Sequence, residues 1–130
     1  MSDPRKLSQI LYIEDSDETR SLVRRLLSHK YVVLEAADPL NGLQLAEETH
    51  PSLILLDHNL RHMTGSEAAT RLRKMLPNTP IVIVSADLST GARERALAAG
   101  AVGFITKPID DDFVEQVDEY LNGKVEILED

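Results

Sequence analysis

LILLDHNLRHMTG (residues 53–65) runs from four apolar residues directly into an aspartate, Asp57, and then through a polar loop to Gly65. A short, continuous apolar run is typical of a strand that is covered on both faces of a parallel sheet. Asp57 ends this run with no Lys or Arg beside it in the sequence. We therefore expect the partners of this carboxylate to arrive from other parts of the chain.

Apolar runs of this kind recur along the chain, at residues 10–13, 32–34, 53–56, 81–84 and 102–105. Amphipathic helical patterns separate the runs, and a last helix follows the fifth. A chain of 130 residues suits one domain. This alternation predicts an α/β domain in which a parallel sheet carries helices on both faces.

Several helix boundaries are marked by residues that favour caps. Ser16 is predicted to begin the first helix and Asp38-Pro39 the second, because a side-chain oxygen caps free N–H groups and proline suits a first turn. Gly100 and Gly123 are predicted to end the last two helices.

The composition narrows the classes of function. Lys and Arg total 14 against 22 Asp and Glu, and the resulting net charge of −8 disfavours direct nucleic-acid binding. Cysteine is absent, which excludes disulfides, thiolate metal sites and thiol catalysis. The chain shows neither a signal peptide nor an apolar run long enough to span a membrane, so we expect a cytoplasmic protein without membrane contact.

Polar residues follow the predicted strands: Glu14-Asp15, Asp57, Ser85 and Lys107. The carboxyl ends of parallel strands meet at one edge of a sheet, where ligands bind. Taken singly, these residues also suit caps and turns. Together, carboxylates a few Å apart repel each other by roughly 1–4 kcal/mol, which one lysine does not offset. Because Mg²⁺ prefers carboxylate, water and phosphate oxygens, the cluster predicts a magnesium site with a carboxylate poised to attack phosphorus.

In this order, the residues resemble the receiver domain of bacterial two-component response regulators. The resemblance covers residues 9–122 and rests on Glu14-Asp15, Asp57, Gly65, Ser85-Ala86 and the run AGAVGFITKP at residues 99–108. It implies a flavodoxin-like, doubly wound fold with strand order 2-1-3-4-5. Residues 1–8 would then be an N-terminal extension, and residues 123–130 a C-terminal tail or the start of a linker.

The resemblance implies a phosphoacceptor site. Asp57 would accept a phosphoryl group from the phosphohistidine of a histidine kinase or a histidine phosphotransfer protein. Asp15, Asp57 and the backbone carbonyl of Asn59 would hold Mg²⁺, for which Mn²⁺ could substitute, and Glu14 would contact the ion through water. The domain would be a signalling phosphoprotein rather than an enzyme, although it would assist its own phosphotransfer and dephosphorylation.

The resemblance also implies a switch. Lys107 would pair with one phosphoryl oxygen, Ser85 would bring its hydroxyl to another, and Phe104 would turn inward behind it. The Lys107–Pro108 peptide bond would be cis, and Gly65 would shape the loop after the acceptor. The face of the fourth helix, fifth strand and fifth helix would contact a downstream effector protein or a fused effector domain, or a second copy in a homodimer.

Two residues depart from the family's pattern. Arg61 stands where the family usually has proline, and Thr64 stands where an acidic residue commonly precedes the loop glycine. These departures change the loop and place a charge near the site, but they leave the acceptor-site residues intact. Asp87 occupies a position that influences water access and acyl phosphate lifetime in relatives. His58 and His62 lie on a predicted loop rather than on one helix face, so a histidine metal site is not favoured.

Two charged segments are interpreted as solvent-exposed helix faces. The first is residues 93–95 (RER) in the fourth helix. The second is acidic and lies around the last helix; its members are Asp110, Asp111, Asp112, Glu115, Asp118 and Glu119. The acidic face is also expected to influence the choice of partner electrostatically.

Three other functions are alternatives to a phosphoacceptor receiver domain. A flavodoxin-like electron carrier or nucleotide-binding domain needs a phosphate loop, but EDSDET at residues 14–19 is acidic and lacks glycine. A metal-dependent aspartyl phosphatase needs a second acid two residues after the nucleophile, where Asn59 stands. A degenerate receiver, used only for protein–protein interaction or dimerisation, is the remaining alternative, and the intact acceptor residues argue against it.

Overall fold

The computed structural model describes residues 7–87 and 89–127. Its strands are β1 (Gln9–Ile13), β2 (Val32–Ala36), β3 (Leu53–Asp57), β4 (Ile81–Ser85) and β5 (Gly103–Thr106). Its helices are α1 (Asp17–Leu27), α2 (Pro39–Thr49), α3 (Gly65–Met75), α4 (Thr90–Ala98) and α5 (Phe113–Leu121). Strands and helices alternate along the whole described chain, as predicted.

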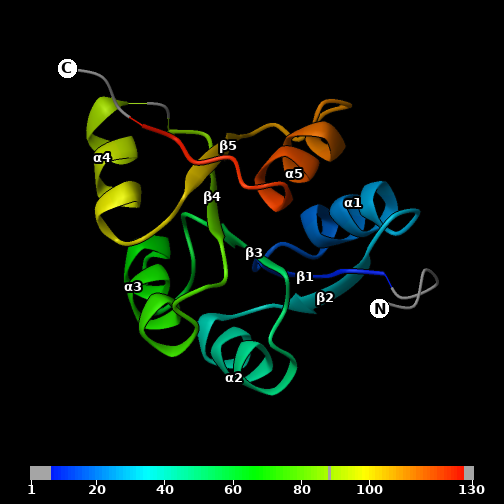
Figure 1. Ribbon diagram of the computed structural model, residues 1–130, viewed down its shortest axis with the longest axis horizontal. Coiled ribbons are helices and arrows are strands. Elements are labelled where there is room, and N and C mark those ends of the chain that lie inside the picture. Colours follow the sequence, from blue (N-terminus) through cyan, green and yellow to red (C-terminus); the bar gives the residue numbers. More distant parts are fainter. Residues whose placement is uncertain (1–6, 88, 128–130) are drawn as a thin grey trace.

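The strands form one parallel sheet in the order β2-β1-β3-β4-β5, which confirms the expected topology. Helices α1 and α5 cover one face of the sheet, and α2, α3 and α4 cover the other (Figure 1). The expected terminal segments are described only in part, since residues 1–6 and 128–130 lie outside the described residues.

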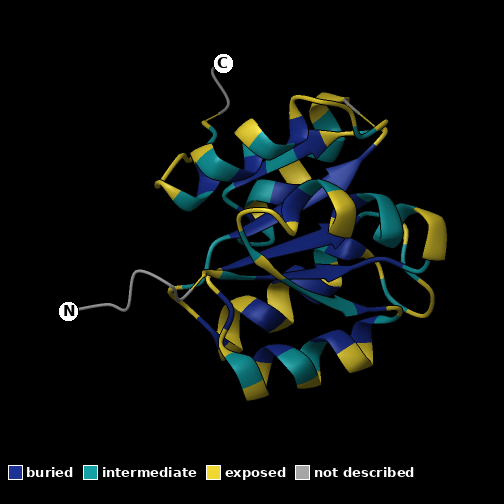
Figure 2. Ribbon diagram, turned by 90° about the vertical axis from the view of Figure 1, so that its right-hand side faces the viewer, coloured by how far each residue is buried: buried dark blue, intermediate teal, exposed yellow. Residues whose placement is uncertain are grey.

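Alternate residues of each central strand enter two separate hydrophobic cores. Ile54 and Leu56 of β3 pack against α2, α3 and α4, whereas Leu53 and Leu55 pack against α1 and α5. All residues of β3 and β4 are buried, and exposed residues gather on the outer sides of the helices and in the loops (Figure 2). Burial of each such side chain contributes about 1.5–3 kcal/mol, so an uninterrupted apolar run is what this position requires.

The central strands extend past their apolar runs into polar residues. Asp57 is the last residue of β3 and pairs in register with Val84, while Ser85 is the last residue of β4 and pairs with Thr106. The strand ladder needs only backbone groups, so a polar side chain does not end it. As a result, Asp57 and Ser85 are carried to the same edge by adjacent strands.

The predicted caps are present. The Ser16 hydroxyl accepts a hydrogen bond from the Thr19 N–H at 3.2 Å, and Asp38 caps α2 through the Asn41 N–H at 2.9 Å. Gly100 follows the end of α4 with φ +104° and Gly123 follows α5 with φ +100°; L side chains rarely adopt such angles.

The described part of the C-terminal segment packs back on the domain. The Glu126 N–H donates to the Val102 carbonyl at 2.7 Å, and the Tyr120 hydroxyl donates to the Glu126 carboxylate at 3.2 Å. Within residues 7–87 and 89–127, no helix is both long and apolar enough to cross a membrane.

Candidate functional site

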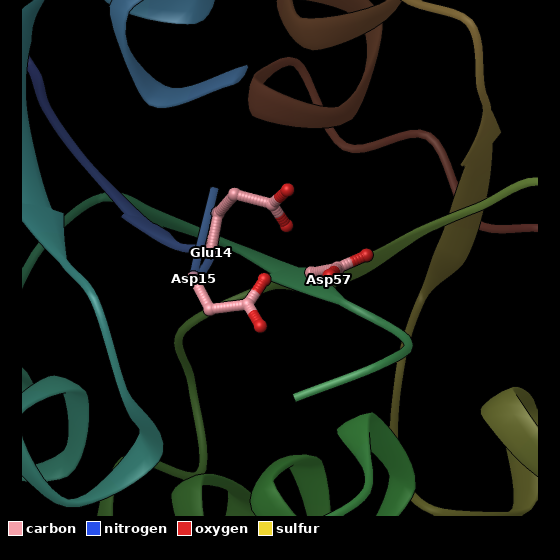
Figure 3. A group of neighbouring side chains, drawn as sticks. All are labelled: Glu14, Asp15 and Asp57. Carbon is pink, nitrogen blue, oxygen red and sulfur yellow. The ribbon is translucent and has the colours of Figure 1, made fainter. Parts of the chain in front are cut away.

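Three carboxylates gather at the carboxyl edge of the sheet. Glu14 and Asp15 follow β1, Asp57 ends β3, and each contributes an oxygen to a group whose atoms lie within 4.8 Å of one another. Figure 3 shows the side chains of Glu14 and Asp15 extending from the end of β1 toward Asp57. The sequence prediction that these strand ends meet is therefore correct.

Lys107 supplies a cation to this group from the segment after β5. Its ammonium lies 2.8 Å from Oδ1 of Asp57 and 3.4 Å from Oε1 of Glu14. Burial works against its charge, but the carboxylates of Asp57 and Glu14 prevail and raise the pKa of Lys107. Asp57 has no Lys or Arg beside it in the sequence because its counter-ion, Lys107, lies 50 residues away in the chain.

Glu14 is the most deeply buried member of the group, with 2% of its surface exposed. Burial, and then the proximity of Asp57, raise its pKa to about 8. Its Oε2 is buried and has no hydrogen-bond partner among the described residues. A buried, unpartnered carboxylate oxygen is costly, and a bound cation or an ordered water would satisfy it. The donor set therefore fits a hard divalent cation.

The loop after Asp57 approaches the end of β3 closely. A Cβ atom at Gly65 would lie 2.8 Å from the backbone oxygen of Asp57, which explains why this position requires glycine. The Gly65 N–H donates to the His58 carbonyl at 3.0 Å, and the Thr64 hydroxyl caps α3 by accepting from the Glu67 N–H at 3.1 Å. Thr64 thus has a structural role that its departure from the family pattern did not indicate.

Arg61 of the same loop forms a second ion pair with the acidic group. Its Nε lies 3.7 Å from Oδ2 of Asp15, and its side chain is 78% exposed. The sequence predicts a charge near the site at this position, but it does not identify Asp15 as the partner.

Ser85 lies beside a small pocket of about 10 Å³. Its hydroxyl accepts a hydrogen bond from the Asp87 N–H at 3.0 Å. The pocket is lined by His58, Ile83, Ser85, Asp87, Ala92, Arg93, Ala96 and Phe104. Phe104 on β5, half-buried, therefore lies at the same pocket as Ser85.

Arg93 corrects the interpretation of residues 93–95 as a wholly solvated face. Its guanidinium carbon lies 4.9 Å from the centre of the Phe104 ring, and its Nε is buried without a hydrogen-bond partner among the described residues. An aromatic ring attracts a cation placed over its face, and this attraction draws the side chain inward. Glu94 and Arg95 are exposed, as interpreted.

Asp118 likewise corrects the interpretation of a wholly solvated acidic face. The Lys30 ammonium lies 2.7 Å from one of its oxygens, and the Tyr31 hydroxyl donates to the other. These two hydrogen bonds lower the pKa of Asp118. Asp118 therefore joins α5 to the turn that precedes β2.

The peptide bond between Lys107 and Pro108 is cis. The Lys107 N–H donates to the Ser85 carbonyl at 2.9 Å, which holds the segment after β5 against the end of β4. A cleft of about 400 Å³ lies beside it and is lined by Thr19, Leu22, Ala86, Lys107, Pro108 and Ile109.

This chain is similar in sequence and in structure to receiver domains of response regulators. The response regulator receiver domain family matches residues 10–117. The polar-differentiation response regulator DivK of Brucella ovis is 32% identical over 116 residues, which cover 86% of this chain and 94% of that protein. A CheY-like response regulator receiver domain protein from Methanospirillum hungatei has a TM-score of 0.85 at 28% identity, with 92% of this chain and 97% of that chain covered.

Two of the relatives are much longer proteins. Histidine kinase P4 of Formosa agariphila is 32% identical over 78% of this chain, and the match spans 8% of its own length. The protein-glutamate methylesterase/protein-glutamine glutaminase of Ralstonia nicotianae is 34% identical over 83% of this chain, and the match spans 29% of its length. The chain thus corresponds to one portion of each of these proteins.

Proposed function

The chain belongs to the response regulator receiver domain family of two-component signalling, and we propose that it accepts a phosphoryl group on Asp57. The observation that carries this proposal is the pairing of Asp57 with Lys107 inside a group of three carboxylates. Asp57 is 4% exposed, so its reactive oxygens are oriented by neighbours rather than by bulk water. A preorganised charge pair of this kind costs no reorganisation when a phosphoryl group arrives.

We assign Asp15, Asp57 and the backbone carbonyl of Asn59 as ligands of Mg²⁺, with Glu14 acting through a water molecule. The proximity of the carboxylates and the unpartnered Glu14 Oε2 support this assignment. When bound, the ion would shield the negative charge of an incoming phosphoryl group.

The proposed reaction uses a phosphohistidine as the phosphoryl donor. A carboxylate oxygen of Asp57 attacks phosphorus, an O–P bond forms, and the P–N bond of the donor breaks. The released imidazole takes one proton and leaves as the neutral ring. Lys107, already 2.8 Å from Asp57, would pair with a phosphoryl oxygen of the acyl phosphate product.

We propose that the acyl phosphate is read out through Ser85 and Phe104. The Ser85 hydroxyl, which now accepts from the Asp87 N–H, would turn to a phosphoryl oxygen. Phe104, which lines the same small pocket as Ser85, would turn inward behind it. A local charge change would thereby bias the surface of α4, β5 and α5 towards a second conformation.

The partners follow from this chemistry. The donor would be a histidine kinase or a histidine phosphotransfer protein, because an acyl phosphate forms readily from a phosphohistidine. The output would go to a downstream effector, either a separate protein or a fused domain, that distinguishes the two conformations of the α4–β5–α5 surface.

Intact mass spectrometry would test the proposal. The protein is incubated with acetyl phosphate, with and without Mg²⁺, beside Asp57→Asn and the control Asp111→Asn, which removes an exposed carboxylate outside the group. We expect one added phosphoryl group in the wild type and in Asp111→Asn with Mg²⁺, and none in Asp57→Asn or without Mg²⁺. No adduct in the wild type, together with no Mg²⁺ binding, would overturn the proposal and favour a degenerate receiver used only for protein contacts or dimerisation.

A further inference from the structure

The pair of Arg61 and Asp15 places a second cation beside the candidate metal site. Nε of Arg61 lies 3.7 Å from Oδ2 of Asp15, one of the three clustered carboxylates. The two residues line a common open cleft of about 660 Å³ together with Asp17, Ala37, Asp38, Leu40, Asn41 and His62. Arg61, with a side chain 78% exposed, therefore contacts Asp15, whereas the less exposed Lys107 contacts Asp57 and Glu14.

Other acidic side chains in the cleft already have partners. Asp17 pairs with Arg20, and Asp38 caps α2 through the Asn41 N–H and side-chain amide. Asp15 is thus the carboxylate to which Arg61 contributes a counter-charge. It is also a proposed metal ligand, so the same carboxylate serves two cations.

The exposure of Arg61 indicates that its ion pair with Asp15 contributes little to the free energy of unfolding. The Arg61 side chain is 78% exposed and that of Asp15 is 32% exposed. Exposed ion pairs of this kind stabilise proteins only weakly. Their effect on a neighbouring ion is different, because a divalent cation at Asp15 must displace the guanidinium and is then repelled by it. Both effects oppose metal binding.

Building on the phosphoacceptor function proposed above, we infer that Arg61 is a displaceable counter-ion of Asp15 that sets the Mg²⁺ concentration at which the site fills. In the metal-free protein, Arg61 neutralises Asp15. When the ion binds, Arg61 releases Asp15 and turns into the open cleft that it already lines. Arg61 acts here as a positioning residue and takes no part in the bond-forming step.

Isothermal titration of the full chain with Mg²⁺ would test this inference; tryptophan fluorescence is not an option, since the chain has no tryptophan. The variants are Arg61→Gln, which removes the charge, Arg61→Lys, which keeps it, and Arg25→Gln, which removes an exposed charge on α1. We expect Arg61→Gln to bind Mg²⁺ about two- to fivefold more tightly, the scale of an exposed ion pair, and the gain to shrink at high salt. Arg61→Lys and Arg25→Gln should resemble the wild type.

Each other outcome is decisive. Unchanged or weaker Mg²⁺ binding in Arg61→Gln would overturn the inference, and so would equal tightening in Arg25→Gln, which would show an effect of net charge alone. Phosphorylation by acetyl phosphate separates this inference from the proposed function. If the wild type is phosphorylated at saturating Mg²⁺ but Arg61→Gln has the Mg²⁺ affinity of the wild type, only the role of Arg61 is overturned. If the wild type binds Mg²⁺ but is not phosphorylated, only the phosphoacceptor function is overturned.

Discussion

Arg93 lies over the ring of Phe104, with its guanidinium carbon 4.9 Å from the ring centre. Arg93 belongs to α4 and Phe104 to β5, so the stacked pair joins two elements of the surface that we propose for output. The ring also lines the pocket beside Ser85. The pair therefore connects the outer surface to the residues next to the acceptor site.

Replacing Arg93 should reveal the strength of this contact. We expect Arg93→Ala to lower the free energy of unfolding by about 1 kcal/mol, which is the scale of a partly desolvated cation–π contact. Arg93→Lys should lose less, because an ammonium keeps the charge but not the planar stacking. Urea denaturation measures both. Arg95→Ala, an exposed change on the same helix, should stay within about 0.5 kcal/mol of the wild type. Equal losses at both positions would rule out a specific contact.

The buried carboxyl of Glu14 predicts that the metal-free protein loses stability as pH rises. Its pKa is raised to about 8 from an ordinary value of 4.5, so between these values the folded state holds a proton that the unfolded state has released. The free energy of unfolding then falls with increasing pH in that window. Glu14→Gln removes this dependence and should be more stable than the wild type at pH 8 by at least about 1 kcal/mol, the value of one pKa unit.

Urea denaturation with a chelator, at pH 5 and pH 8, checks this expectation. The control is Glu18→Gln, which removes an exposed carboxylate in the first turn of α1 and should keep the slope of the wild type. A Glu14→Gln variant with the same pH slope as the wild type would show that Glu14 is ionised in both states.

The fold and the acidic group could be predicted from the sequence because both depend on local patterns. Continuous apolar runs specify buried strands, caps such as Ser16 and Gly100 delimit helices, and parallel strands necessarily bring their ends together. Asp57 and Lys107 therefore meet wherever their strands are correctly ordered.

The partners of Arg61, Arg93 and Asp118 could not be predicted in this way. Each side chain is long or lies on a helix surface, and its partner belongs to a different element or loop. A charged residue on a helix face has the same pattern whether it is solvated or reaches across to another element. Only the packing of the elements decides between these two arrangements.

From the hydrogen bonds of Asp118, we predict that its contribution to the free energy of unfolding depends on pH in the opposite direction to that of Glu14. Lys30 and Tyr31 lower the pKa of Asp118 below its ordinary value of 3.8, so its contribution is present above that value and is lost as pH falls through the lowered pKa. We expect Asp118→Asn to cost about 0.5–1 kcal/mol at pH 7, after allowance for solvent screening. The difference from the wild type should vanish near pH 2. Asp111→Asn, an exposed control, should cost nothing measurable at either pH.

From the close packing of Gly65 against the end of β3, we predict that a change at this position affects both the stability of the protein and the acceptor site. A Cβ atom there would lie 2.8 Å from the Asp57 carbonyl oxygen and 3.1 Å from Cα of His58. These are backbone atoms, so Gly65→Ala must displace either the start of α3 or the end of β3. We expect a cost of about 1–3 kcal/mol in the free energy of unfolding, as for other overpacked sites. Mg²⁺ binding should weaken roughly tenfold, because such sites tolerate displacements of only about 0.5 Å.

Gly91→Ala is the matched control for this prediction. Gly91 lies within α4, and a Cβ atom there would contact only the Arg95 side chain, at 3.2 Å, which is flexible and exposed. Alanine in the first turn of α4 should therefore change the free energy of unfolding by no more than about 0.5 kcal/mol and leave Mg²⁺ affinity unchanged. Urea denaturation and calorimetric titration of both variants distinguish the effects. If Gly65→Ala loses stability but binds Mg²⁺ like the wild type, the strain is absorbed by α3, and the carboxylate of Asp57 is held by Lys107 and the strand ladder rather than by the loop.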